Sequence, residues 1–145
     1  MSKYFGTDGF RGEANKILKA DDAYKIGRYL GWYYSREHRG HIVIGKDTRR
    51  SSYMFEYALV AGITASGSDA FLLHVTTTPS VAYVVRTEDF DCGIMVSASH
   101  NPYYDNGIKI IDGNGHKIAS DIEEAMENYI DGIGEELPFA TGEAV

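Results

Sequence analysis

Apolar and polar positions follow two different periods along the chain, and these periods divide it into helices and strands. Helical spacing of three and four residues links Ala23, Ile26 and Leu30, and it predicts a helix over residues 21–38. The same reasoning predicts three more helices, at residues 51–66, 81–86 and 120–130. Short apolar runs bounded by turn residues predict four strands, at residues 41–45, 70–75, 91–96 and 108–112.

The order of these elements indicates the fold class. Strands that alternate with helices favour right-handed crossovers, so we expect an α/β fold: a three-layer α/β/α sandwich with a mixed, mainly parallel sheet of about four strands. We expect one domain over residues 1–131. Residues 132–145 contain Gly and Pro without a sustained period, which is typical of a linker or tail towards further domains.

Composition and charge narrow the function classes. The chain has 145 residues, of which 43% are apolar and 24% charged, as in globular proteins. Its formal charge of −7 argues against nucleic acid or an anionic membrane as a partner, so an anion site requires locally clustered Lys and Arg. The single Cys92 excludes an internal disulfide, and no apolar run follows Met1, so a cytoplasmic location is expected.

Three polar loops directly follow predicted strands: "KDTRRSS", "TTTPS" and "SASHNP". In open α/β sheets the ligand crevice lies at the carboxyl ends of the strands, so these loops are predicted to converge on one site. Solvent-exposed turns explain the first two loops equally well. The third loop carries Ser99, His100 and Asn101 within three positions and is the strongest candidate for chemistry.

Ser99 has two possible catalytic uses. His100 as its base would indicate a hydrolase, but neighbouring side chains on an extended chain point in opposite directions, and no G-x-S-x-G motif is present. A phosphoryl group on Ser99 fits better, since it adds roughly −1.5 to −2 charge that Lys109 and Arg11 can answer. An exposed strand lysine is the plain alternative for Lys109.

The N-terminal stretch "FGTDGFRG", residues 5–12, is the second candidate for anion binding. Thr7, Gly9 and Arg11 lie in it, and its glycines let backbone N–H groups and a guanidinium converge on a phosphate. The P-loop pattern G-x-x-x-x-G-K-[ST] is absent from the sequence, so a nucleotide site is not indicated. A glycine-rich terminal turn is the plain alternative.

Taken together, four stretches resemble the first domain of the α-D-phosphohexomutase superfamily: "FGTDGFRG", "IGKDTRRSSYMFEYALVAGITASG", "TTTPSVAYVVR" and "VSASHNPYYDNGIKI". The resemblance covers residues 3–131. It implies a phosphohexomutase, an isomerase that interconverts glucosamine 6-phosphate and glucosamine 1-phosphate through a sugar 1,6-bisphosphate. It also implies that Ser99 is the phosphoserine and binds Mg²⁺ through its phosphate.

The resemblance assigns the remaining roles by motif position. Lys109 would be a general acid or base, Arg11 would steady the phosphate, and His100 and Asn101 would shape the loop. The family's other Mg²⁺ ligands come from an Asp-rich "DGDxDR" loop that this sequence lacks. We therefore expect an isolated first domain that folds but turns over no substrate without the remaining domains of the enzyme.

Two alternatives remain open at this point. A related hexomutase acting on mannose or glucose phosphates shares these motifs, because the sugar-selecting loop lies outside the first domain. A non-catalytic module that binds a sugar phosphate would also retain the Ser99 loop.

Overall fold

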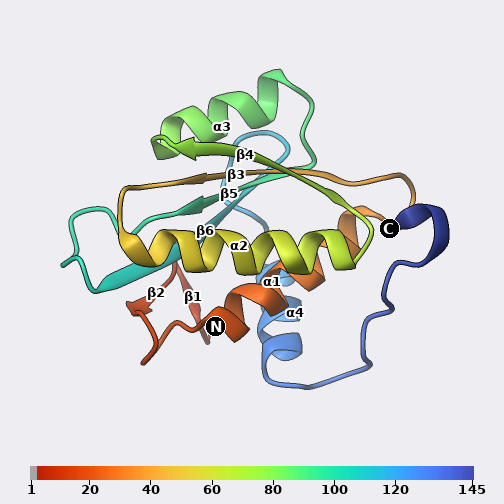
Figure 1. Cartoon of the computed structure of the whole chain (residues 1–145), viewed down its shortest axis with the longest axis horizontal. Helices are drawn as coiled ribbons and strands as arrows, with labels where there is room; N and C mark the ends of the chain where they lie inside the picture. Colours follow the sequence, from red (N-terminus) through yellow and green to blue (C-terminus); the bar gives the residue numbers. More distant parts are fainter. Residues whose placement is uncertain (1–2) are drawn as a thin grey trace.

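The computed structural model describes residues 3–145 as a three-layer α/β/α sandwich. One helix, α3, covers one face of the central sheet, and α1, α2 and α4 cover the other face (Figure 1). The predicted fold class is confirmed. No helix within residues 3–145 is long and apolar enough to span a lipid bilayer.

The strands are β1 (Phe5–Gly6), β2 (Gly9–Glu13), β3 (His41–Lys46), β4 (Asp69–Val75), β5 (Cys92–Val96) and β6 (Asp105–Asp112). The helices are α1 (Ala20–Tyr34), α2 (Arg50–Ala65), α3 (Thr78–Thr87) and α4 (Ser120–Ile130), followed by a short 3₁₀ helix, η1 (Gly142–Ala144). The four predicted helices and four predicted strands are all present, with shifted ends.

The sheet is larger than the predicted four strands. Its six strands run in the order β1-β2-β6-β5-β3-β4. Strand β3 pairs in parallel with β4 and β5, whereas β5–β6, β6–β2 and β2–β1 are antiparallel. Antiparallel pairings therefore outnumber parallel ones in a sheet predicted to be mainly parallel. The reason is the glycine-rich N-terminus, which forms a short hairpin on the free side of β6 instead of an isolated turn.

Two apolar clusters hold the layers together. The larger cluster joins Ile26 of α1, Leu59 of α2 and Met126 of α4 to one face of the sheet. The smaller cluster joins Val81 and Val85 of α3 to the other face. Because α3 is short, it covers only part of its face, and the section formed by β2 and the start of β6 is left without a helix over it (Figure 1).

Glu127 on α4 anchors the N-terminal hairpin. It is buried, and its carboxylate accepts hydrogen bonds from the backbone N–H groups of Tyr4 (2.6 Å) and Phe5 (2.9 Å). Burial of Glu127 opposes its ionisation, but these backbone hydrogen bonds prevail and lower the pKa of the carboxyl. The anchor fixes β1, which pairs with β2, the strand that carries Arg11.

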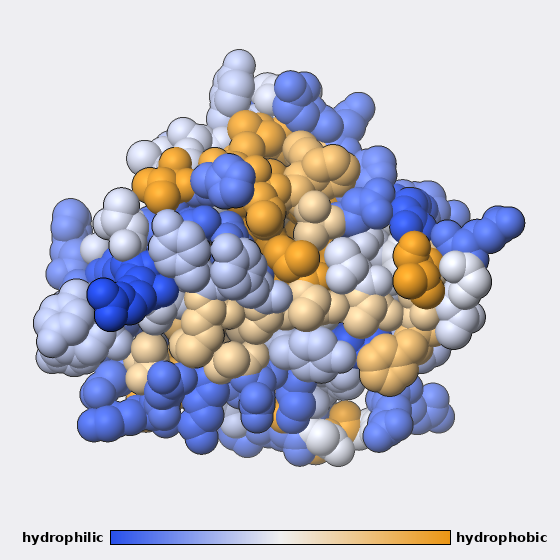
Figure 2. Space-filling model, in the orientation of Figure 1, coloured by the Kyte–Doolittle hydropathy of each residue, from blue (hydrophilic) through white to orange (hydrophobic). Residues whose placement is uncertain are grey.

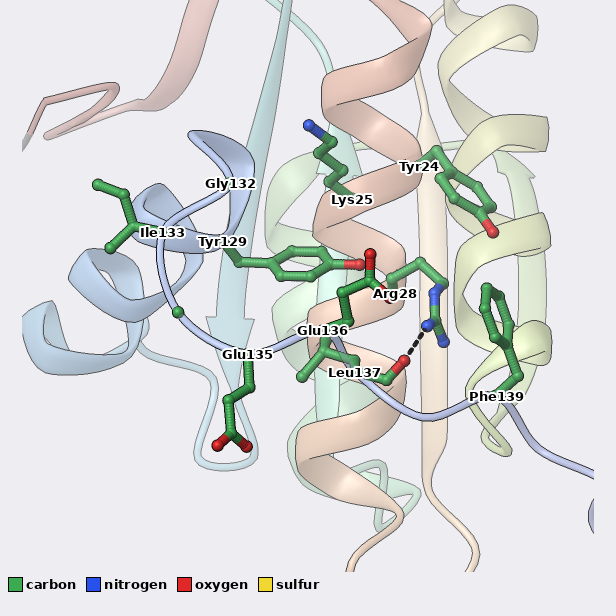
Figure 3. Close-up of a pocket in the computed structure, with 11 residues that line it drawn as sticks. Tyr24, Lys25, Arg28, Tyr129, Gly132, Ile133, Glu135, Glu136, Leu137 and Phe139 are labelled. Atoms are coloured by element: carbon green, nitrogen blue, oxygen red, sulfur yellow. Dashed lines mark hydrogen bonds between the residues drawn. The ribbon is translucent and has the colours of Figure 1, made fainter.

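The segment after α4 folds back across α1 and α2. The buried guanidinium of Arg28 donates hydrogen bonds to the carbonyls of Leu137 (2.6 Å) and Pro138 (3.2 Å), and the Phe139 ring lies over it at 3.8 Å (Figure 3). The N–H of Ala140 donates to a carbonyl of α2 at 2.9 Å. A cleft of about 300 Å³ remains between this segment, α1 and α4.

Strand β4 forms the open edge of the sheet. Its side chains Phe71 and Val75 are exposed, at 42% and 54% respectively. Figure 2 shows apolar surface gathered here, between α3 and α2. This edge lies at the opposite end of the sheet from β1 and β2.

Candidate active site

The loop between β5 and β6 presents Ser99 to solvent. Both Ser99 and His100 are exposed, as the sequence indicated for a loop at the carboxyl end of a buried strand. Ser99 has a φ of 56°, in the left-handed region, and its N–H donates to the hydroxyl oxygen of Ser97 at 3.0 Å. For a residue other than glycine this conformation costs roughly 1–2 kcal/mol. Other contacts must therefore hold the loop in this shape.

Arg11 and Lys109 project from one face of the sheet. Arg11 lies opposite Gly107 in the antiparallel β2–β6 pair, and Lys109 is two residues further along β6. Side chains two residues apart on a strand share a face. Lys109 lies opposite Met95, which packs against α3, so both cationic side chains are on the α3 side.

The Ser99 loop leaves β5 over this same face. A Cβ atom added at Gly107 would lie 2.7 Å from the carbonyl oxygen of Ser97 and 2.7 Å from Cγ of Arg11. Only glycine leaves room there for both the loop and the arginine. The structure thus places the start of the Ser99 loop over the face from which Arg11 and Lys109 project. Within residues 3–145, no hydrogen bond or ion pair joins the Ser99 hydroxyl to either cation.

Two buried side-chain nitrogens have no hydrogen-bond partner among residues 3–145: Nε of Arg11 and Nε of Arg49. A buried donor without a partner costs free energy. The Arg11 side chain as a whole is only partly buried, and a guanidinium suits the phosphate-binding role predicted for it.

The two other N-terminal candidates have different surroundings. Thr7 is exposed at the turn between β1 and β2. Gly9 has a φ of 89° and is buried against β6, where an added Cβ would lie 2.3 Å from the carbonyl oxygen of Ile108 and 2.9 Å from Cα of Lys109. The glycine thus brings the hairpin close to the lysine.

Asn101 contributes to the shape of the loop. Its side-chain amide donates to Asp105 at 3.3 Å, and its carbonyl accepts a hydrogen bond from Arg49 at 2.6 Å. His100, by contrast, has no hydrogen bond within the described part of the chain.

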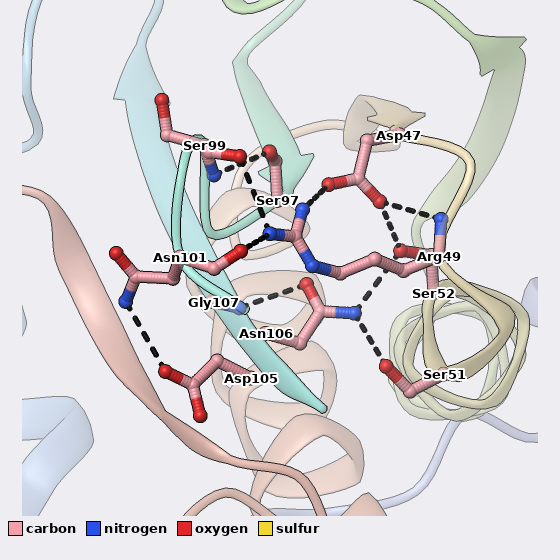
Figure 4. A network of polar contacts seen from close by, with 10 residues as sticks. All are labelled: Asp47, Arg49, Ser51, Ser52, Ser97, Ser99, Asn101, Asp105, Asn106 and Gly107. Carbon is pink, nitrogen blue, oxygen red and sulfur yellow. Dashed lines mark hydrogen bonds and ion pairs between the residues drawn. The ribbon is translucent and has the colours of Figure 1, made fainter. Parts of the chain in front are cut away.

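A polar cluster lies beneath the Ser99 loop (Figure 4), in the "KDTRRSS" loop that the sequence predicted to converge there but to whose residues it assigned no role. Arg49 forms an ion pair with Asp47 and donates to the carbonyls of Ser99 (3.2 Å) and Asn101 (2.6 Å). The Ser52 hydroxyl donates to Asp47 at 2.7 Å. The detectable signal was the position of "KDTRRSS" after β3, because β3 and β5 are parallel neighbours whose following loops lie side by side.

The ionisation of Asp47 reflects this cluster. Burial of the carboxyl raises its pKa, but hydrogen bonds from Ser52, from the backbone N–H of Arg49 and from Ser97, together with the charge of Arg49, lower it overall. Asp47 is therefore a carboxylate at neutral pH and holds Arg49 by charge.

Two further buried groups connect β3 and β6 to α2. Lys46, the last residue of β3, forms an ion pair with Glu56 at 2.9 Å, and both side chains are at most 2% exposed. Asn106, fully buried, donates to the hydroxyls of Ser51 (2.9 Å) and Ser52 (3.0 Å). The first two turns of α2 are thus fixed to β3 and to β6, the strand that follows the Ser99 loop.

The described residues form no metal centre of their own. Within residues 3–145, no group of three or more His, Cys, Asp or Glu side chains is placed to hold a metal ion.

The fold and the site define an α/β/α domain with an exposed serine and two cations on one sheet face. The sequence profile described as "Phosphoglucomutase/phosphomannomutase, alpha/beta/alpha domain I" matches residues 2–136. The chain belongs to this family, so the predicted phosphohexomutase resemblance is confirmed.

Curated relatives carry a more specific name. The phosphoglucosamine mutase of Lachnoclostridium phytofermentans is 67% identical over 145 residues, which cover 100% of this chain and 32% of the relative. That of Lachnospira eligens is 66% identical and covers 100% of this chain and 33% of the relative. The chain therefore spans about a third of the length of these relatives.

Solved structures share the fold. A phosphoglucomutase/phosphomannomutase family protein from Burkholderia thailandensis superimposes with a TM-score of 0.75 at 27% identity, over 91% of this chain and 31% of that protein. The Paramecium phosphoglucomutase parafusin, at 18% identity, has a TM-score of 0.70 over 95% of this chain and 27% of that protein, which shows the shared fold alone.

Proposed function

We propose that this chain is the phosphoserine-bearing first domain of a phosphoglucosamine mutase. The whole enzyme interconverts glucosamine 6-phosphate and glucosamine 1-phosphate through a sugar 1,6-bisphosphate. The observation that carries the proposal is the exposed Ser99 hydroxyl on a fixed loop, over the sheet face from which Arg11 and Lys109 project. The 67% identity to a phosphoglucosamine mutase over the whole chain supports the choice of substrate.

Phosphoryl transfer depends mainly on positioning and on neutralising charge, and the site offers both. The bond between phosphorus and Ser99 Oγ breaks as a sugar hydroxyl oxygen bonds to phosphorus. Lys109 takes the proton of that hydroxyl and relays it to Ser99 Oγ, which is released as the serine hydroxyl. In the reverse half of the cycle the other phosphoryl group of the bisphosphate passes to Ser99 Oγ, and Lys109 relays the proton of the Ser99 hydroxyl to the sugar oxygen left behind.

The other site residues have supporting roles in this proposal. Arg11 binds the transferred phosphoryl group through its guanidinium. Thr7 and Gly9 form the hairpin wall beside it, and Gly9 allows close approach of the backbone to Lys109. His100 and Asn101 define the shape of the loop around Ser99.

Mg²⁺ fits the proposed site only in part. A phosphoryl oxygen on Ser99 is the kind of hard ligand that Mg²⁺ prefers, but residues 3–145 offer no carboxylate cluster to complete its shell. When bound, the ion would neutralise phosphate charge. We propose that Ser99 supplies one ligand through its phosphate and that the remaining domains supply the others.

The remaining domains are the expected partners, since the relatives are about three times as long as this chain. We propose residues 1–131 as the catalytic domain and 132–145 as the connection onward, in a cytoplasmic enzyme that binds neither nucleic acid nor membrane. A substrate with mannose or glucose is the second candidate, favoured by the phosphoglucomutase/phosphomannomutase profile. A sugar-phosphate module without catalysis is the third.

The test is Ser99→Ala in the full-length protein, with Ser120→Ala as the matched control because Ser120 is an exposed serine on α4. Ser99→Ala should abolish interconversion of glucosamine phosphates and leave the melting temperature nearly unchanged, whereas Ser120→Ala should retain activity. Activity of Ser99→Ala equal to the control contradicts the proposal. Parallel assays with mannose and glucose phosphates separate the candidate substrates.

A further inference from the structure

The backbone around Ser99 has few connections to the rest of the domain. Asn101 N–H donates to the Ala98 carbonyl at 3.0 Å, and the N–H of Ser99 and the side chain of Asn101 also bond within the loop. Among the described hydrogen bonds of residues 98–102, only those from Arg49 come from outside the segment 97–105. Among the described hydrogen bonds, those from Arg49 therefore tie the backbone at Ser99 to the rest of the domain.

Arg49 is itself held from several directions. Its side chain is only 11% exposed, and its Nη1 pairs with Asp47 while Nη2 donates to the two loop carbonyls. Asp47 in turn accepts from the Arg49 backbone N–H at 3.0 Å and from Ser52 at 2.7 Å. A planar guanidinium fixed in this way defines where both carbonyls lie.

The orientation of Ser99 shows what this contact does. Its carbonyl oxygen points to Arg49 and its hydroxyl points away (Figure 4). The guanidinium thus acts on the backbone of the loop, and the hydroxyl faces outward. The left-handed φ of 56° at Ser99 has an intrinsic cost, which the two hydrogen bonds from Arg49 help to offset.

We propose that Arg49 is a positioning residue for phosphoryl transfer, which holds the Ser99–Asn101 backbone so that Oγ of Ser99 faces the substrate. The inference rests on the proposed function. It differs from the roles of Arg11 and Lys109, because Arg49 acts through the loop carbonyls and touches neither the phosphoryl group nor the sugar.

The test compares Arg49→Gln and Arg49→Lys with Arg50→Gln in the full-length protein. Arg50 is the neighbouring arginine. Its side chain is exposed and forms no hydrogen bond or ion pair within residues 3–145, so Arg50→Gln makes the same charge change without removing a contact to the Ser99 loop. We measure kcat, KM, the melting temperature and, by mass spectrometry, the phosphate on Ser99 after incubation with glucosamine 1,6-bisphosphate.

Arg49→Gln should lower kcat about a hundredfold, as expected when a reacting group is displaced by about 1 Å, and leave KM within about twofold. Arg49→Lys should be almost as slow, since one ammonium does not reproduce the guanidinium fork. Arg50→Gln should retain the parent kcat.

Three results overturn the proposal: a kcat of Arg49→Gln equal to that of Arg50→Gln, a change confined to KM, or a change confined to the melting temperature. If Arg49→Gln fails to fold, Arg49→Lys decides by the same criteria. Absence of phosphate on Ser99 in the unchanged protein is a different outcome, because it overturns the proposed function itself.

Discussion

Arg28 and Arg49 each hold a chain segment through hydrogen bonds to its backbone carbonyls, but the two contacts have different consequences. Arg28 and Arg49 each donate to a pair of backbone carbonyls, those of residues 137 and 138 and those of residues 99 and 101. Arg28 is 2% exposed and its guanidinium is covered by Phe139, whereas Arg49 lies beside a solvent-exposed loop. The first contact closes the domain surface, and the second holds the exposed loop that carries Ser99.

The partners of the two guanidinium groups differ as well. Arg49 is paired with the Asp47 carboxylate. Arg28 bonds to neutral oxygens, including the hydroxyl of Ser66 at 2.6 Å, and within residues 3–145 it forms no ion pair. Hydrogen bonds from a guanidinium to neutral oxygens are insensitive to acid, whereas an ion pair with a carboxylate is lost when that carboxylate is protonated. The difference between the two sites is therefore measurable.

The largest effect on stability is expected from Arg28→Gln. The variant leaves buried oxygens without their donor and removes the stacking on Phe139, so the free energy of unfolding should fall by about 3 kcal/mol. Denaturant unfolding measures it. The control is Arg50→Gln, a change at an exposed arginine whose side chain forms no hydrogen bond or ion pair within residues 3–145, and it should cost no more than about 0.5 kcal/mol. Equal losses in the two variants would show that Arg28 is not a structural anchor.

Asp47→Asn tests the carboxylate that distinguishes the two sites. Because the pKa of Asp47 is lowered in the folded state, its contribution to stability is present above the ordinary value of 3.8 and disappears as the pH falls through the lowered pKa. The difference in unfolding free energy between the parent and Asp47→Asn should therefore shrink in acid. The difference in unfolding free energy between the parent and Arg28→Gln should not shrink in acid. Measuring both variants over the same pH range therefore tests whether the Arg28 and Arg49 sites differ as described.

Phe139→Ala should have the smallest effect. The ring is 63% exposed, so its loss removes mainly the contact with the Arg28 guanidinium, worth about 1 kcal/mol. Phe139→Leu, which keeps apolar cover without the aromatic face, is the matched variant. If both variants unfold at the parent's denaturant concentration, the segment after α4 does not depend on this contact.

Much of the fold could be predicted from the sequence because the interior elements have strong periodicity. The strands at residues 41–46 and 92–96 are built around the apolar runs 42–44 and 94–96, and Ala23, Ile26 and Leu30 mark one helix face. The N-terminal hairpin was not predicted, because β1 is only two residues long and two of the five residues of β2 are glycines. Strand β2 is held by its pairing with β6, and β1 by its pairing with β2, and no local sequence pattern reveals these pairings.

The candidate site divides in the same way. Ser99, Arg11 and Lys109 were found because each lies in a distinctive local motif. The role of Arg49 depends on contacts with residues about fifty positions away, and that of Arg28 on a segment more than a hundred positions away. Contacts between distant loops follow from strand order, so they became visible only when the sheet was assembled.

Phosphosite mapping of the full-length protein after incubation with glucosamine 1,6-bisphosphate tests most directly whether Ser99 carries the transferred phosphoryl group. We expect one phosphoryl group per chain, located on Ser99 and transferred to added glucosamine phosphate. Phosphate on a different residue, or a phosphate on Ser99 that added substrate does not remove, contradicts this expectation.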